Sequence, residues 1–374
     1  MDGLYWQDGG SMIQGYPGIL TIDLQALARN YRRLAVMAAP AAAAAVVKAD
    51  AYGLGAARVA PALAAAGCRD FFVAHAGEAL SLRQLLPPDA RLMVLNGLLP
   101  GSEALCAEAG IIPVLNSLEQ LARWQDLAAT RGQILPALLQ FDTGMSRLGF
   151  APEERQAVKQ ALATGPGLDI RYVMSHLACA DEPEHAQNEA QLADMRKVME
   201  EFAAIPPCFA NSGGILLGAS YHGALARPGL ALYGGTPAPA KGNPMEPVVK
   251  LDVAVVQTRR VGAGAAVGYG ASFVARGETL LAVIAAGYAD GLPRSLGGRG
   301  AAYYQGARLP IAGRVSMDSI IIDISALPEG ALKLGSLVEV IGPHQTLEDL
   351  AGDADTISYE ILTSLGRRYR RVYL

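Results

Sequence analysis

Lys48 is the residue whose type and place most strongly suggest chemistry. It stands in the segment AAAVVKADAYGLG (43–55), where an alanine and valine run gives way to a polar turn that contains glycine. Such a run predicts a buried strand, and a lysine at its end either reaches solvent or has a chemical role. A desolvated lysine loses its proton readily and can form a Schiff base with a carbonyl cofactor. The spacing alone leaves both alternatives open.

Other polar residues also follow predicted apolar strands. They are His75, Asn96, Asn116, Asp142, His176 and Asn211. In a (β/α)8 barrel the catalytic groups collect at the carboxyl ends of the strands. The series therefore favours a single rim that carries all of these side chains together with Lys48.

The elements that would position this rim alternate between strands and helices. A short strand at 19–22 precedes a helix that Asp23 caps. The predicted strands that follow are 43–48, 71–75, 92–96, 111–116, 134–142, 170–176, 208–212 and 231–234, and the predicted helices include 78–86, 118–130, 152–163 and 188–203. Eight strands with helices between them predict an N-terminal (β/α)8 barrel, with a doubly wound open sheet as the alternative.

A second domain is predicted after the segment 237–244, which reads PAPAKGNP. Its prolines and its turn interrupt regular structure, and beyond it the apolar period becomes 2. Strands are predicted at 248–261, 280–286, 308–312, 319–324, 336–341 and 370–374, with short helices at 346–350 and 357–365. We therefore expect a barrel over residues 23–241 and a mostly antiparallel β domain over residues 242–374, joined by a strand from residues 1–22.

Composition excludes several classes of partner. The 374 residues carry a formal net charge of −4 and contain no basic tract, which argues against nucleic acid as a partner. The four cysteines lack any zinc-ligand spacing, which favours reduced thiols and no metal. The longest apolar run, 38–47, is too short for a membrane span, and the first ten residues lack the basic region of a signal peptide. A cytoplasmic protein is expected.

Eight motifs in this order resemble the alanine racemases, the pyridoxal-phosphate-dependent enzymes of fold type III. They are VVKADAYGLG (46–55), FDTGMSRLGF (141–150), MSHLA (174–178), NSGG (211–214), ARPGLALYG (226–234), AGYADGLPRSL (286–296), GRVSMD (313–318) and ISYEILTSLG (357–366). The resemblance covers residues 18–374. It implies an amino-acid racemase that interconverts L- and D-alanine and supplies D-alanine for peptidoglycan.

The resemblance also implies residues that hold pyridoxal 5'-phosphate. Lys48 matches the lysine that forms the Schiff base, and Tyr52 would face the phosphate. The glycine-rich segment after Asn211 leaves backbone N–H groups free for an anion. The further matches on the phosphate side are Asn211, Ser212, Gly229, Leu230 and Tyr359. Arg227 matches an arginine that donates to the pyridine nitrogen, which makes the cofactor a weaker electron sink than a carboxylate partner would.

Racemisation needs two proton-transferring groups on opposite faces of the cofactor-bound substrate. By resemblance these are Lys48 and Tyr288, with His176, beside Arg227, helping the phenol to ionise. In the family the tyrosine comes from the other subunit, so a homodimer with shared active sites is implied. Met317 of the same contributed surface would meet the substrate carboxylate through its backbone N–H. Arg147 would help to hold that carboxylate and the phenolic oxygen of the cofactor.

Gln140 is a departure from the family pattern. Many members carry there a lysine that is carbamylated and orients the arginine that Arg147 matches, whereas the amide of Gln140 is neutral. We expect chloride, or a water with the Gln140 carbonyl, to fill the gap.

Other functions remain as alternatives. A broad-specificity or serine racemase would use the same scaffold, whereas a cofactor-binding homeostasis protein would resemble the barrel alone. Fold type III decarboxylases share both domains, but a tyrosine at position 288 favours proton exchange.

Overall fold

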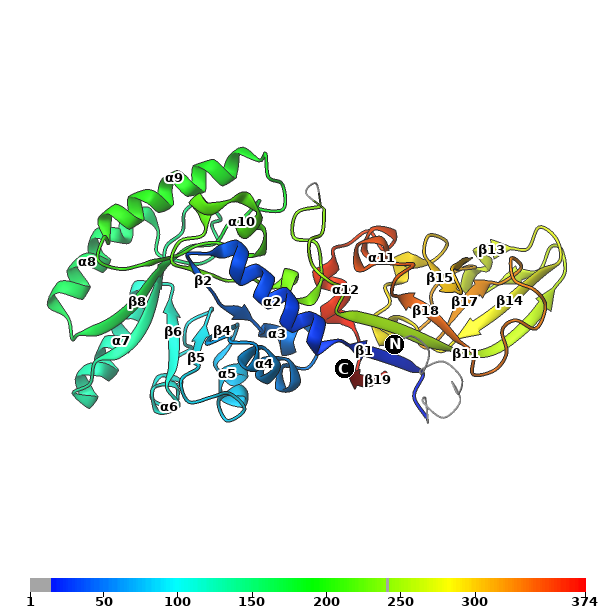
Figure 1. Cartoon of the computed structure of the whole chain (residues 1–374), viewed down its shortest axis with the longest axis horizontal. Coiled ribbons are helices and arrows are strands. Elements are labelled where there is room, and N and C mark those ends of the chain that lie inside the picture. The colour runs from blue at the N-terminus through cyan, green and yellow to red at the C-terminus, as the bar shows by residue number, and fades with distance from the viewer. Residues whose placement is uncertain (1–14, 240–241) are drawn as a thin grey trace. The chain divides into compact units, whose positions relative to one another are not determined.

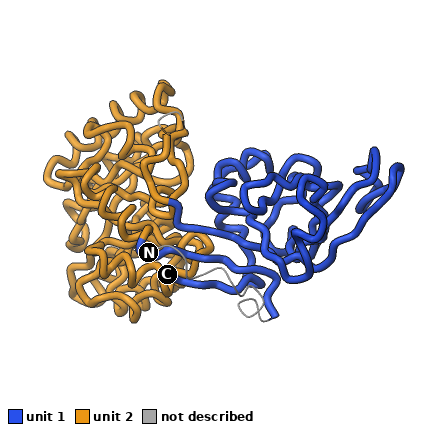
Figure 2. The backbone as a smooth tube through the Cα atoms, turned by 45° about the vertical axis from the view of Figure 1, so that its right-hand side comes forward, with its two compact units in different colours: residues 1–25, 247–374 blue, residues 26–246 orange. Residues whose placement is uncertain are grey.

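The computed structural model describes residues 15–239 and 242–374 (Figure 1). The chain divides into two compact units, Ala26–Glu246 on the one hand and Met1–Gln25 with Pro247–Leu374 on the other (Figure 2). The leader at 1–10 and part of the predicted boundary, residues 240–241, lie outside the described residues. The predicted limits 23–241 and 242–374 stay a prediction.

The unit Ala26–Glu246 is built on a parallel sheet of seven strands that follow one another in chain order. They are β3 (Ala45–Val46), β4 (Asp70–Val73), β5 (Arg91–Val94), β6 (Ile111–Leu115), β7 (Leu135–Gln140), β8 (Leu168–Met174) and β9 (Pro207–Cys208). All five residues of β6 are buried, as are all four of β4. Burial on both faces explains why these strands read as continuous apolar runs.

Two further short strands close this sheet into a barrel. β2 (Ala42–Ala43) pairs in parallel with β10 (Leu225–Ala226). On the β3 side, the Ala44 N–H donates to the carbonyl of Ala226 at 2.8 Å, and on the β9 side the Arg227 N–H donates to the carbonyl of Ala210 at 2.7 Å. β10 therefore fills the eighth position, and the predicted closed barrel is confirmed.

Three details of the barrel prediction were wrong. The run predicted as the eighth strand, 231–234, is instead a 3₁₀ helix, η3 (Leu230–Tyr233), and the strand at that position is β10. The strand before Lys48 ends at Val46, so that Lys48 begins the short helix α3 (Lys48–Tyr52). β9 ends at Cys208, and Ser212 begins α10 instead of ending a strand. Short apolar runs do not distinguish these states by periodicity.

Helices connect the strands and lie outside the sheet in Figure 1. They are α2 (Leu24–Ala38), α4 (Ala56–Ala65), α5 (Ala76–Arg83), α6 (Glu103–Glu108), α7 (Leu118–Arg131), α8 (Arg155–Thr164), α9 (Ala186–Glu201) and α10 (Ser212–Leu217). As predicted, Asp23 caps α2, since its Oδ1 accepts from the Gln25 N–H at 2.8 Å.

The other unit contains a sheet of eight strands, and within residues 15–239 and 242–374 β1 and β19 are its one parallel pair. Its central strands β11 (Val249–Val261), β1 (Gly18–Ile22) and β18 (Leu337–Ile341) are flanked by β14 (Thr279–Ile284), β15 (Ala301–Tyr304), β16 (Ala307–Pro310), β17 (Ile320–Asp323) and β19 (Arg370–Tyr373). A separate hairpin joins β12 (Ala266–Val267) to β13 (Phe273–Val274), and the helices are α11 (Leu347–Asp353) and α12 (Ser358–Ser364). The predicted mostly antiparallel β domain is confirmed, although β15 was missed.

Within the described ranges, none of the helices combines the length and the apolar character that crossing a membrane requires.

Candidate active site

Lys48 opens a turn with an unusual backbone. Ala49, Asp50, Ala51 and Tyr52 all have φ between 52° and 55°, in the left-handed region. Non-glycine residues pay about 1–2 kcal/mol each there, so other contacts must hold the turn. The Ala49 N–H donates to Oε1 of Glu78 at 2.6 Å, and the Ala56 N–H donates to Oδ1 of Asp50 at 2.7 Å. This turn places Lys48 and Tyr52, four residues apart, at the same end of the barrel.

The Lys48 ammonium lies among other cations. Burial lowers its pKa, and the nearby charges of Arg147 and Arg227 lower it further, against an opposing effect of Glu78. No hydrogen bond or ion pair holds its amino group within residues 15–239 and 242–374. An amine that deprotonates readily and is not engaged elsewhere can act as a nucleophile or as a base.

His176 and Arg227 lie side by side. Nη1 of Arg227 and Nδ1 of His176 are 3.5 Å apart, and Nη2 of Arg227 also donates to the carbonyl of Phe209 at 3.3 Å. Burial, then the charges of Arg227, Arg147 and Lys48, lower the pKa of His176 well below its ordinary value. The imidazole is therefore neutral at pH 7, so Nδ1 can accept from Arg227 and leave a hydrogen on Nε2.

Arg227 has one hydrogen-bond donor without a partner among the described residues. The residue is 3% exposed, and within the described part of the chain its Nε has no hydrogen-bond partner. A buried donor without an acceptor is costly. A ligand that offered an acceptor to Nε would remove this cost.

Ser212, Gly229 and Tyr52 come together from three segments. The Gly229 N–H donates to Oγ of Ser212 at 2.8 Å, and a Cβ at position 229 would lie 2.3 Å from the Tyr52 hydroxyl. A side chain at position 229 would therefore displace the Tyr52 hydroxyl. Asn211 caps α10 by accepting from the Gly214 N–H at 2.8 Å, which leaves the N–H groups of Ser212 and Gly213 as first-turn donors. Leu230, which begins η3, is buried at 2% exposure.

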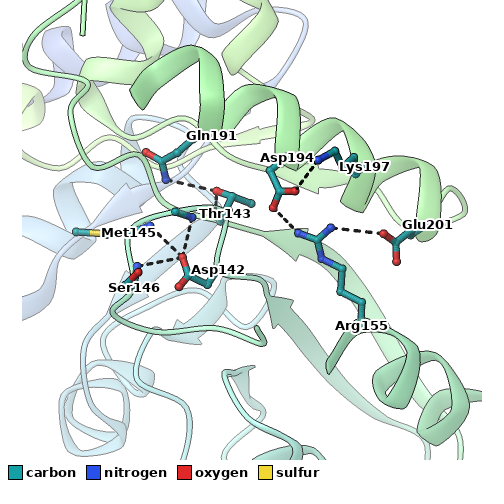
Figure 3. Close-up of polar contacts among 11 residues, drawn as sticks. Asp142, Thr143, Met145, Ser146, Arg155, Gln191, Asp194, Lys197 and Glu201 are labelled. Atoms are coloured by element: carbon teal, nitrogen blue, oxygen red, sulfur yellow. Dashed lines mark hydrogen bonds and ion pairs between the residues drawn. The ribbon is translucent and has the colours of Figure 1, made fainter. Parts of the chain in front are cut away.

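Arg147 lies in an exposed loop after β7. Oδ1 of Asp142 accepts from the N–H groups of Gly144, Met145 and Ser146 at 2.8–3.1 Å and so fixes the start of this loop (Figure 3). Gln140, at the end of β7, donates through Nε2 to the carbonyl of Leu148 at 3.2 Å. Among the described residues no carboxylate pairs with Arg147.

Gln191 of α9 is a supporting residue that the sequence did not reveal. It is fully buried, and its Nε2 donates to the carbonyl of His176 at 2.9 Å and to Oγ1 of Thr143 at 3.4 Å (Figure 3). Its Oε1 accepts from the Ala178 N–H at 2.8 Å. One amide thus joins the loop that carries Arg147 to the segment that carries His176. A glutamine in a helix gives no sequence signal of such a role.

Glu78 was missed as well, although its signal was present. It is the third residue of α5 after the N-cap His75, and its Oε2 accepts from the N–H groups of Ala74 and His75 at 2.7 and 3.0 Å. A glutamate at this spacing is a recognised capping arrangement.

Tyr288, Met317 and Tyr359 belong to the other unit. Tyr288 begins the 3₁₀ helix η6 (Tyr288–Asp290), and its N–H donates to the carbonyl of Ser316 at 3.0 Å. The Ala289 N–H donates to the carbonyl of Met317 at the same distance, so the structure brings the segments of Tyr288 and Met317 together. Tyr359 lies in the first turn of α12. All three side chains are exposed within the unit, at 45%, 53% and 41%.

The barrel residues therefore form one cationic site. Three cations, a neutral imidazole and first-turn N–H donors favour an anionic ligand, and the amine of Lys48 can attack a carbonyl group on it.

Comparisons with known proteins agree with this chemistry. The family model for the alanine racemase N-terminal domain matches residues 22–237, and that for the alanine racemase C-terminal domain matches residues 248–373. The chain is 64% identical over 360 residues to the catabolic alanine racemase of Agrobacterium fabrum, covering 96% of this chain and 93% of that protein. It is 61% identical over 363 residues to the catabolic alanine racemase of Rhizobium johnstonii, with 97% and 96% covered.

A solved structure shows the same relationship. The alanine racemase from Bartonella henselae, with covalently bound pyridoxal phosphate, superposes with a TM-score of 0.92 at 45% identity, covering 96% of this chain and 99% of that one. The two family models together span nearly the whole chain and the identities are high. The chain therefore belongs to the alanine racemase family.

Proposed function

We propose that the chain interconverts L- and D-alanine with pyridoxal 5'-phosphate as its cofactor, through two bases, Lys48 and Tyr288. The observation that carries the proposal is the Lys48 amine, whose pKa is lowered by burial and by Arg147 and Arg227. Membership of the alanine racemase family supports the substrate, and the covalent pyridoxal phosphate of the Bartonella henselae enzyme supports the cofactor.

The residues present fit this cofactor. Bound through Lys48, it would take electron density from Cα of the substrate and make the proton there acidic. The Nε–H of Arg227, which has no partner among the described residues, is suited to donate to the ring nitrogen of the cofactor. The Tyr52 hydroxyl, Ser212 and the first-turn N–H groups of α10, with Asn211, Gly229 and Leu230 beside them, suit a phosphate. By resemblance alone, Tyr359 would also contact it.

Proton exchange at Cα needs one group on each face. Lys48 holds or returns the proton on one face, and Tyr288 does so on the other. Tyr288 is 45% exposed and needs a partner for its hydroxyl, which suits donation to the site of a second copy of the chain. The Nε2 hydrogen of neutral His176 would stabilise the ionised phenol. The enzyme would therefore be a homodimer with shared active sites.

Arg147 and Met317 would hold the substrate carboxylate. The guanidinium of Arg147 is exposed in its loop, and the Met317 N–H has no acceptor among the described residues. Since Gln140 is neutral and donates to Leu148, a chloride ion beside Arg147 and Gln140 would supply the missing negative charge.

The physiological direction is a finer question. Two relatives are catabolic alanine racemases, which favours use of the enzyme in alanine breakdown over supply of D-alanine to peptidoglycan. A cytoplasmic location is proposed on the sequence alone. The match over residues 248–373 speaks against a cofactor-homeostasis protein that resembles the barrel alone.

The decisive assay measures D-amino acid formation from a panel of L-amino acids with added pyridoxal phosphate. Alanine should be converted with the highest kcat/KM, and serine more slowly. Faster conversion of serine would replace the proposal with the serine or broad-specificity alternative. In the Tyr288→Phe variant, net racemisation should fall in both directions, because each direction uses both groups, whereas exchange of the Cα proton with solvent should be lost from one enantiomer of alanine and retained from the other. Exchange lost equally from both enantiomers would contradict separate roles.

A further inference from the structure

An ionic bridge in the unit that carries Tyr288 has no part in the proposed mechanism. Nε and Nη2 of Arg368 donate to Oδ1 and Oδ2 of Asp290 at 2.6 and 2.7 Å, and Nη1 donates to Oδ1 of Asp318 at 2.7 Å. This uses the planar fork of the guanidinium on three sides, which lysine cannot reproduce. The side chain of Arg368 thereby joins the segments of Asp290 and Asp318, which are 28 residues apart in the sequence (318 − 290).

Both segments carry a residue of the proposed site. Asp290 ends η6, two residues after Tyr288, and its Oδ2 also accepts from the Gly287 N–H at 3.0 Å. Asp318 directly follows Met317. Two backbone hydrogen bonds link the same segments, from Tyr288 to Ser316 and from Ala289 to Met317, each at 3.0 Å. The bridge and these bonds together fix one segment against the other.

The contact between the segments is close. A Cβ at Gly287 would lie 2.2 Å from the carbonyl oxygen of Ser316 and 2.4 Å from that of Met317. The side chains of Tyr288 and Met317, by contrast, are about half exposed and receive little packing from their own unit. Their positions therefore depend on the backbone that carries them.

The two carboxylates are in different environments. Asp290 is 1% exposed, and a buried charge that loses its partner is strongly destabilising. The Asp318 side chain is 62% exposed, so its removal costs little folding stability. The two carboxylates raise the pKa of Arg368, which remains charged at all working pH values. Asp318 therefore offers a way to weaken the bridge without unfolding the protein.

We propose that Arg368 is a positioning residue. Through Asp290 and Asp318 it fixes the position of the Tyr288 hydroxyl relative to the Met317 N–H. The proposal rests on the proposed function, since it assigns Tyr288 to proton transfer and Met317 to the substrate carboxylate. Small displacements of reacting groups are costly, and a shift of about 1 Å can reduce the rate about a hundredfold.

The test compares four variants of the holoenzyme. Asp318→Ala removes one arm of the bridge, Asp318→Asn keeps an acceptor without the charge, and Arg368→Lys keeps the charge without the fork. Arg260→Met is the matched control, because Arg260 also pairs with two carboxylates, Glu278 and Glu329, in the same unit. For each variant, kcat and KM are measured in both directions, with deuterium at Cα of L- or D-alanine, and thermal unfolding is followed.

We expect Asp318→Ala to raise KM and lower kcat/KM about three- to tenfold with an unchanged unfolding temperature, and Asp318→Asn to retain near wild-type values. Arg368→Lys should lower kcat at least about tenfold. Its isotope effect should grow in one direction only, the direction in which Tyr288 removes the proton from Cα. The control Arg260→Met should change neither the kinetic constants nor the isotope effects.

Two results would overturn the proposal. One is an Asp318→Ala variant with the kinetics of the wild type, and the other is an Arg368→Lys variant that loses stability while its isotope effects stay unchanged. If Tyr288→Phe itself were fully active, the proposed function would fail instead. The two failures are therefore distinguishable.

Discussion

The barrel and the β unit hold their predicted site residues by different means. In the barrel, the fully buried amide of Gln191 links the loop of Arg147 to the segment of His176, and the carboxylate of Asp142 accepts from backbone N–H groups of the same loop. In the β unit, a guanidinium and two carboxylates hold the segments of Tyr288 and Met317.

The charges of the site residues explain this difference. The barrel site gathers Lys48, Arg147 and Arg227, and a carboxylate paired directly with one of them would offset more of the positive potential that attracts an anionic cofactor and substrate. The Gln191 amide links its two segments without altering that potential, whereas the nearby carboxylates of Glu78 and Asp142 accept from backbone N–H groups and form no ion pair with these cations among the described residues. Tyr288 and Met317 are uncharged, so ionic support does not disturb them.

The largest effect is expected from replacing Lys48, the nucleophile in the cationic cluster of the barrel. Lys48→Ala removes the only group proposed to bind the cofactor covalently, so racemisation should fall at least about a thousandfold. The visible absorbance of the lysine-bound cofactor should also disappear. A variant that kept this absorbance would show that another residue binds the cofactor.

Gln191→Leu tests the neutral support directly. It leaves the carbonyl of His176 and the N–H of Ala178 without their partner, so the unfolding free energy should fall by about 2–3 kcal/mol. KM for L-alanine should rise about tenfold, because the Arg147 loop loses an anchor. Glu189→Ala is the control, since Glu189 lies on the same helix and accepts from the Tyr221 hydroxyl instead. Equal KM values in the two variants would contradict the assignment.

His176 makes the barrel sensitive to acid. Its pKa in the folded protein lies below the unfolded value of about 6.5. The unfolded chain therefore binds more protons than the folded protein below that pH, and stability rises with pH in this window. As pH falls below about 6.5, His176 should remove up to about 1.4 kcal/mol per pH unit. Urea unfolding of wild type and His176→Asn at pH 5, 6 and 7 should show this slope in the wild type alone, and parallel slopes would refute it.

The smallest effect concerns the anion proposed beside Arg147. Replacing chloride by gluconate at constant ionic strength should raise KM for alanine about twofold to fivefold, since Arg147 loses its negative neighbour. Gln140→Glu supplies a fixed charge there and should abolish the chloride dependence. A wild-type enzyme indifferent to chloride would leave the water alternative.

The sequence predicted the architecture better than the supports of the site. Alternating apolar runs correctly indicated the barrel, because parallel strands buried on both faces leave a strong signal. β10 was missed because it has only two residues, and the apolar run beyond it forms η3. The left-handed turn at Ala49–Tyr52 gave no local sequence signal. Part of its support is distant in sequence, since the Ala49 N–H donates a hydrogen bond to Glu78. Gln191 and Arg368 act across 48 and 78 residues of sequence, and such contacts appear only in the folded chain.

The central claim is that Lys48 and Tyr288 act from different copies of the chain, and complementation tests it most directly. Lys48→Ala and Tyr288→Phe are each nearly inactive, and co-expression of the two gives mixed dimers in which one site is intact and the other lacks both groups. If assortment is random, half of the dimers are mixed, so activity should recover to about a quarter of the wild-type value. Recovery no greater than the sum of the two variants alone would contradict the account.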